Sequence, residues 1–180
     1  MTARLLHRER AALVVVDVQE AFRPAVREFD RVARNAAVLV QGAKALGVPV
    51  IATEQYPRGL GETVPEVAEH LDGATGPLEK TAFSAAAAEG FDLGGRDQAL
   101  LCGIEAHVCV SQTAHDLLDR GLEVHVARDA VTSRTEENAE LGLHKMEGAG
   151  AVLTSVETAL FELLGAAGTE EFKTVQRLVK

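Results

Sequence analysis

The sequence predicts a three-layer α/β/α protein with a doubly wound, mainly parallel sheet between two layers of helices. Short apolar segments alternate with longer amphipathic ones, which is typical of buried parallel strands joined by helices. The expected strands are 13–16, 48–53, 98–102, 122–127 and 151–153. A chain of 180 residues with 47% apolar residues can bury one full core, so we expect a single domain over 1–180.

The first expected helix lies between the first two strands. Its apolar residues recur at spacings of three and four, as one face of a helix requires. They are Val32, Ala36, Leu39, Ala43 and Leu46. Gly47 and Pro49 then end the helix before the second strand.

Prolines and glycines interrupt all periodicity over 56–65, which predicts a surface loop at the strand ends. Loops in that position often border a binding site. Further helices are expected after Cys109, ending at Gly121, and over 136–148. The tail 169–180 has the pattern of an amphipathic helix that packs on the body or on a second subunit. Its apolar residues are Phe172, Val175 and Leu178.

Charge and composition point to a small-molecule partner. The net charge is −9 and no lysine- and arginine-rich run occurs, which argues against nucleic acid or an anionic membrane as partner. No apolar run reaches the roughly 18 residues of a membrane span, and residues 1–8 lack the apolar core of a signal peptide. Two cysteines cannot form a disulfide framework. We therefore expect a cytoplasmic protein with no membrane partner.

Cys109 is the strongest candidate for a nucleophile. A strand and a glycine turn deliver it to the start of a helix, where free N–H groups and the helix dipole stabilise a thiolate. We expect its pKa to fall from about 8.5 toward neutrality. Free cysteines are also common core residues, and Cys102 within the strand is expected to be one. Asp17, which ends the first strand, and Lys80, in the run 77–84, add an acid–base group and a cation.

These residues stand in motifs that resemble those of the isochorismatase-like cysteine hydrolases. Asp17 begins a D-x-Q motif, Lys80 lies mid-chain, and Cys109 ends a G-I-x-x-x-x-C turn over 103–109. The resemblance covers nearly the whole chain. The sequence around 54–61 and 101–106 looks like the isochorismatase domain-containing branch, whose substrates are poorly defined.

The resemblance implies a mechanism. Cys109 attacks the carbonyl carbon of a small amide to form a thioester, Asp17 acts as general acid and base, and Lys80 gives electrostatic support. The backbone N–H groups of Glu105 and Cys109 would stabilise the oxyanion, following a cis peptide between Ile104 and Glu105. The carboxylate of Glu105 would disfavour an oxyanion unless its side chain points away.

Further residues are candidates for the substrate pocket. Gln19 could orient Asp17 or a polar substrate group, and apolar walls could come from aromatic residues. These candidates are Gln19, Phe22, Gln55, Tyr56, Phe83 and His107. His107 also suggests a Cys–His dyad, which we rank below Asp17 because its side chain need not face the thiol.

We expect no metal and no cofactor. Nicotinamidases of the same superfamily bind a metal with an aspartate and histidines after the second strand, but this chain has no histidine between His7 and His70. No glycine-rich phosphate-binding motif follows a predicted strand. Two alternatives stay open beside the amide hydrolase: vinyl ether hydrolysis of the isochorismatase type, and a non-catalytic scaffold or interaction protein that retains the fold. Members of the family that this sequence resembles often form homo-oligomers, which we expect here.

Overall fold

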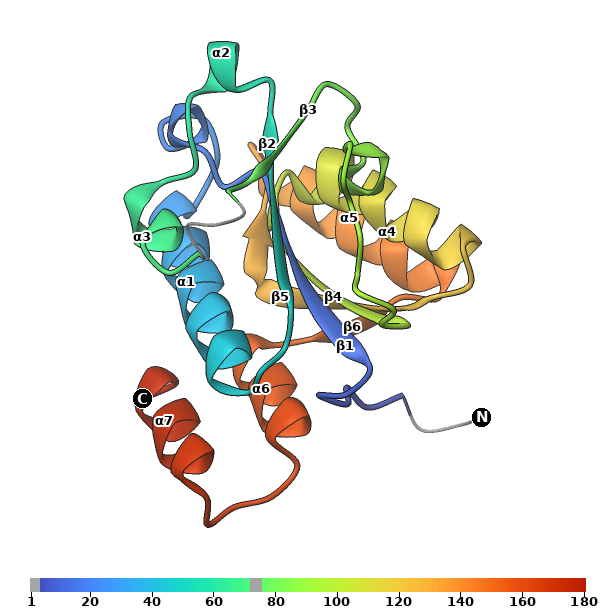
Figure 1. The fold of residues 1–180 in the computed structure, drawn as a ribbon. Coiled ribbons are helices and arrows are strands. Elements are labelled where there is room, and N and C mark those ends of the chain that lie inside the picture. The colour runs from blue at the N-terminus through green and yellow to red at the C-terminus, as the bar shows by residue number, and fades with distance from the viewer. Residues whose placement is uncertain (1–3, 72–75) are drawn as a thin grey trace.

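The computed structural model describes residues 4–71 and 76–180, and within them the chain forms one six-stranded sheet (Figure 1). Every strand pair is parallel, and the order is β3-β2-β1-β4-β5-β6. The strands are β1 Ala11–Val16, β2 Val50–Gln55, β3 Leu78–Lys80, β4 Gln98–Ile104, β5 Glu123–Thr132 and β6 Val152–Thr154. The predicted doubly wound parallel sheet is therefore confirmed.

Helices cover both faces of this sheet (Figure 1). One face carries α1 Phe29–Ala45, α3 Pro65–Ala68, α6 Val156–Leu164 and α7 Glu170–Leu178. The other carries α4 Ser111–Asp119 and α5 Glu136–Ala149. Short helical segments complete the chain: α2 Pro57–Leu60, the 3-10 turns Glu20–Phe22 and Ala85–Ala87, and a π-helical turn Ala106–Val110.

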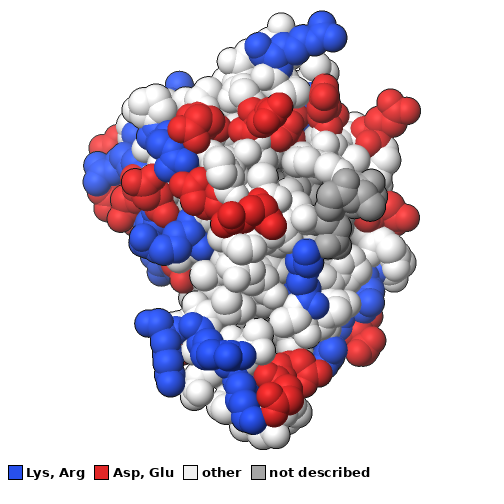
Figure 2. Space-filling view, turned by 60° about the vertical axis from the view of Figure 1, so that its left-hand side comes forward, with Lys and Arg blue, Asp and Glu red and all other residues white. Residues whose placement is uncertain are grey.

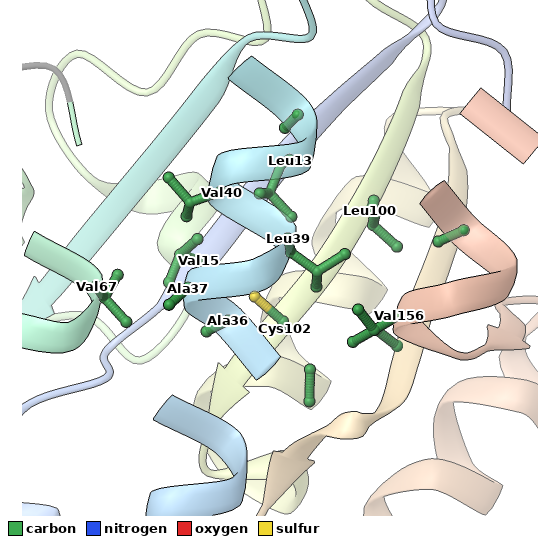
Figure 3. Close-up of a cluster of buried hydrophobic side chains, with 14 of the residues drawn as sticks. Leu13, Val15, Ala36, Ala37, Leu39, Val40, Val67, Leu100, Cys102 and Val156 are labelled. Atoms are coloured by element: carbon green, nitrogen blue, oxygen red, sulfur yellow. The ribbon is translucent and has the colours of Figure 1, made fainter. Parts of the chain in front are cut away.

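The core between the sheet and α1 is apolar (Figure 3). Leu39 and Val40 of α1 pack over Leu13 of β1, and all three side chains are fully buried. Cys102 of β4 lies in the same cluster and is also fully buried, as predicted. Burial raises the pKa of the Cys102 thiol to about 12, so this cysteine is an inert core residue.

The predicted helices are present, and α7 packs on the body of its own chain. Val175 is fully buried against the core beneath α1, and the Phe172 ring lies 6.4 Å from that of Phe161 in α6. Val175 is therefore not available to a second subunit. The segment 56–65 is less of a plain loop than expected, because Pro57 and Pro65 each begin a helical turn.

The order of the strands indicates where a binding site would lie. The sheet is built outward in two directions from the neighbouring strands β1 and β4, so the strand order reverses between them. Ligands of open α/β sheets bind beyond the carboxyl ends of the strands at such a switch point. Asp17 directly follows β1 and Glu105 directly follows β4.

Acidic and basic side chains are interspersed on the face shown in Figure 2. In the part of the chain that the structure describes, no helix is both long enough and apolar enough to cross a bilayer.

Candidate active site

Asp17 is fully buried beyond the end of β1. Its backbone takes a left-handed conformation, with φ of 52°, and its peptide N–H donates to the Thr53 carbonyl at 3.2 Å. One carboxylate oxygen, Oδ1, accepts from the Thr53 hydroxyl at 2.7 Å, and the other, Oδ2, accepts from Lys80 Nζ at 2.7 Å. The carboxylate is thus held by a neutral donor on one side and a cation on the other.

Lys80 ends the edge strand β3 and turns inward, with its side chain 1% exposed. Its ammonium donates to Asp17, to Gln55 Oε1 at 2.7 Å and to the Phe83 carbonyl at 2.9 Å. Lys80 is therefore not a solvated surface lysine. It forms a buried ion pair with Asp17 whose remaining donors are satisfied.

Cys109 lies in the π-helical turn between β4 and α4 and is 5% exposed. Its pKa is raised to about 12, chiefly by burial and further by the negative charge of Asp17 and a hydrogen bond to that carboxylate. Lys80 and a backbone hydrogen bond from Glu105 act in the opposite direction. The prediction of a lowered pKa was wrong, because desolvation and a nearby carboxylate outweigh the helix terminus.

The turn before Cys109 is anchored through Glu105. The peptide bond between Ile104 and Glu105 is cis. The Glu105 carbonyl accepts from the N–H groups of Val108 at 3.0 Å and Val110 at 3.1 Å. The Glu105 carboxylate points to Arg134 and accepts from both the backbone N–H and Nε of Arg134, each at 3.1 Å.

Gln19 is more structural than expected. It is fully buried, and its amide donates to the Gln55 and Gly61 carbonyls and accepts from the Gln55 N–H. These bonds hold the segment after β2, and the Gln19 N–H donates to the Asp17 carbonyl at 2.9 Å. That Gln19 orients the Asp17 carboxylate or a polar substrate group stays a prediction. Gln55 orients Lys80, since its side chain joins Lys80 Nζ to the Thr81 carbonyl.

The aromatic candidates differ in exposure. Tyr56 is 54% exposed and Phe83 is 52% exposed, whereas Phe22 is half-buried against the core. A pocket of about 370 Å³ opens beside the end of β3, and it meets the buried cluster through Lys80. It is lined by Tyr56, Pro57, Arg58, Glu79, Lys80 and Thr81.

His107 is half-buried, and its Nδ1 lies 3.0 Å from the Ser133 hydroxyl. This hydrogen bond turns the imidazole toward the segment after β5. Asp17, by contrast, acts on the thiol through its negative charge, which raises the pKa of Cys109.

Thr53 and Arg134 are site residues that sequence reasoning missed. Thr53 carried a weak signal, because it is the polar last residue of the strand predicted over 48–53. In the structure it lies within β2 and is paired with Val16 of β1. Arg134 carried none, since it lies 29 positions from Glu105. Within residues 4–71 and 76–180, no three His, Cys, Asp or Glu side chains converge as a metal site would require.

Comparison with known proteins identifies the family. The isochorismatase domain matches residues 11–158. Isochorismatase domain-containing protein 2 of Danio rerio is 41% identical over 175 residues, covering 94% of this chain and 86% of that protein. The secreted isochorismatase effector Isc1 of Phytophthora sojae is 42% identical over 177 residues, with coverages of 94% and 84%. The chain therefore belongs to the isochorismatase domain family.

Solved structures agree with this assignment. The MAR1 ribonuclease of Caenorhabditis elegans superposes with a TM-score of 0.91 at 40% identity, covering 98% of this chain and 92% of that one. YcaC of Pseudomonas aeruginosa, solved with hexane-2,5-diol and covalent acrylamide, gives 0.86 at 25% identity, with coverages of 99% and 93%. The fold is that of the isochorismatase-like hydrolases.

Proposed function

We propose that the chain is a cysteine hydrolase that cleaves a small amide or related C–N bond through a thioester. Cys109 is the nucleophile, Asp17 the general acid and base, and Lys80 the electrostatic support. The observation that carries this proposal is the buried Asp17 carboxylate, which pairs with the Lys80 ammonium at 2.7 Å and whose negative charge acts on the Cys109 thiol.

In the acylation half of the reaction, Asp17 carries the proton from the thiol to the leaving nitrogen. As sulfur attacks the carbonyl carbon, the carboxylate takes the thiol proton and the carbonyl π pair moves to oxygen. The backbone N–H groups of Glu105 and Cys109 donate to that oxygen. Collapse breaks the C–N bond, and protonated Asp17 gives its proton to the leaving nitrogen. A thiol of raised pKa needs such a base, because few thiolates form unaided.

Deacylation uses the same groups in reverse. Asp17 takes a proton from water as the water oxygen attacks the thioester carbon. The C–S bond then breaks, the carboxylic acid leaves, and the proton returns to sulfur. Lys80 keeps the carboxylate charged between proton transfers, because a nearby cation favours the ionised form.

The relatives add limited support. The YcaC structure contains covalently bound acrylamide, an electrophile that thiols attack. MAR1 is named as a ribonuclease, but the net charge of −9 of this chain disfavours an RNA substrate. We also propose a cytoplasmic homo-oligomer that takes a small molecule and uses no cofactor.

The test is a panel of small amides offered to the wild type and to Cys109→Ala, with ammonia release and acyl adducts measured by mass spectrometry. Cys102→Ala is the matched control, because that thiol lies in the core away from Asp17. We expect turnover in the wild type and the control and none in Cys109→Ala.

The other outcomes separate the alternatives. Turnover that survives in Cys109→Ala would move the chemistry to Asp17 and water, as in vinyl ether hydrolysis. Cleavage of a single-stranded RNA that depends on Asp17 would point to a nuclease. A wild type that is inert to the panel, and whose two thiols label equally slowly, would leave the scaffold as the better account.

A further inference from the structure

Glu105 has three polar groups, its backbone N–H, its backbone carbonyl and its carboxylate, and they point in different directions. We propose that Glu105 is a positioning residue: Arg134 holds its carboxylate so that its backbone N–H faces the oxygen of the reacting carbonyl beside Cys109. This inference rests on the proposed thiol chemistry of Cys109.

The backbone contacts of Glu105 define the turn. Glu105 directly precedes the π-helical turn Ala106–Val110, and its carbonyl accepts from Val108 and Val110. Cys109 lies four residues on, within this turn. The peptide N–H of Glu105 also acts on its sulfur, because it lowers the pKa of the Cys109 thiol against the larger effect of burial.

The carboxylate of Glu105 is the group that needs control. Its side chain is 10% exposed, and a free negative charge this close to a developing oxyanion would oppose it. Both hydrogen bonds from Arg134 converge on one oxygen, Oε2. The backbone N–H fixes the direction of the carboxylate, and the guanidinium, 60% exposed, compensates its charge.

Two neighbouring contacts join the same segments and limit rotation of the turn. His107 Nδ1 meets the Ser133 hydroxyl at 3.0 Å, one residue before Arg134. Helix α5 packs so closely on the turn that a Cβ at Gly142 would lie 2.6 Å from the Ala106 carbonyl oxygen. The Glu105 carboxylate is thus one of several fixed contacts, and it is the one that carries charge.

The test compares two reagents on Cys109. In acetylation by p-nitrophenyl acetate, sulfur adds to the carbonyl carbon, an oxyanion forms, and p-nitrophenolate leaves with its electron pair. In alkylation by iodoacetamide, sulfur displaces iodide and no charge develops on the carbonyl oxygen. Both need the thiolate, so the ratio of the two rate constants reports donation to the oxyanion.

The variants are Glu105→Ala, Glu105→Gln and Arg134→Met. The control is Arg27→Ala, because the Arg27 side chain is as exposed as that of Arg134, at 59% against 60%, and pairs with Glu136. We expect the ratio to fall about tenfold in Glu105→Ala, part of the loss seen when an oxyanion donor is removed. Gln keeps an acceptor for Arg134 and should restore the ratio to within about threefold. Arg134→Met should fall between them, since its backbone N–H still donates.

Two results would overturn the proposal. An unchanged ratio in Glu105→Ala would show that the carboxylate does not aim the N–H. Rates that fall equally with both reagents in Glu105→Ala, Glu105→Gln and Arg134→Met would show only that the thiol is displaced.

If the wild type is alkylated but never acylated, the proposed function fails by itself. Positioning is then judged by the alkylation pH profile, which must move to higher pH in Glu105→Ala, and no movement refutes it.

Discussion

Removing one partner of the buried ion pair between Asp17 and Lys80 should destabilise the fold strongly. The two side chains are 0% and 1% exposed, and Nζ lies 2.7 Å from Oδ2. At an effective dielectric constant of about 20, charges this close attract by about 6 kcal/mol, against a desolvation cost of several kcal/mol per ion. Removing one partner leaves the other charge buried and uncompensated. We therefore expect Asp17→Asn and Lys80→Met each to lower the free energy of unfolding by about 3–5 kcal/mol.

The double variant Asp17→Asn/Lys80→Met distinguishes pairing from packing. With both charges gone, the loss should be at least about 2 kcal/mol smaller than the sum of the single losses. Urea unfolding of the four proteins, followed by circular dichroism near neutral pH, measures the cycle. Additive losses would refute the claim that the two charges compensate each other.

Three further predictions concern other parts of the fold. Asp17→Asn removes two causes of the raised pKa of Cys109, so its iodoacetamide alkylation profile should shift to lower pH while acyl transfer falls. His125 is fully buried, and burial lowers its pKa below 6.5. The wild type therefore loses stability as the pH falls below 6.5, because the unfolded chain binds a proton that the folded chain does not. Urea midpoints at about pH 7.5 and about pH 5.5 should show His125→Leu becoming more stable relative to the wild type in acid. Gly103→Ala should abolish folding as judged by circular dichroism, because φ is +120° and a Cβ would lie 2.0 Å from the Val16 carbonyl oxygen.

Each of these has a contrary outcome. An Asp17→Asn profile at unchanged pH would mean that the carboxylate does not act on the thiol. A constant difference between His125→Leu and wild type across pH would mean that His125 does not titrate with unfolding. For the glycine, Gly148→Ala is the control, since its Cβ would meet open space; equal expression and melting of both variants would contradict the close approach at Gly103.

Most of the fold could be predicted because the buried strands are strongly apolar. The six residues of β1 are all buried, and such runs separated by amphipathic helices leave few alternatives. β3 escaped prediction because it has only three residues, two of them charged. α6 also escaped prediction because it has only nine residues, and its start is marked by a single cap at Ser155, whose hydroxyl accepts from the Thr158 N–H.

The site was predictable in part. Asp17, Lys80 and Cys109 stand in recognisable motifs, and parallel topology brings strand ends to one edge. The pKa of Cys109 was not predictable, because it depends on burial and on a carboxylate 92 positions earlier in the chain. The contact between Glu105 and Arg134 likewise arises only once β4 and β5 are paired.

The most direct test of the central claim is to find where an acyl group resides during turnover. The wild type is mixed with an acyl donor, quenched in acid, digested and mapped by mass spectrometry. The proposed mechanism predicts a thioester on Cys109 that disappears as product forms, with Cys102 unmodified. Product formation with no acyl group on Cys109, or an acyl group on another residue, would contradict it.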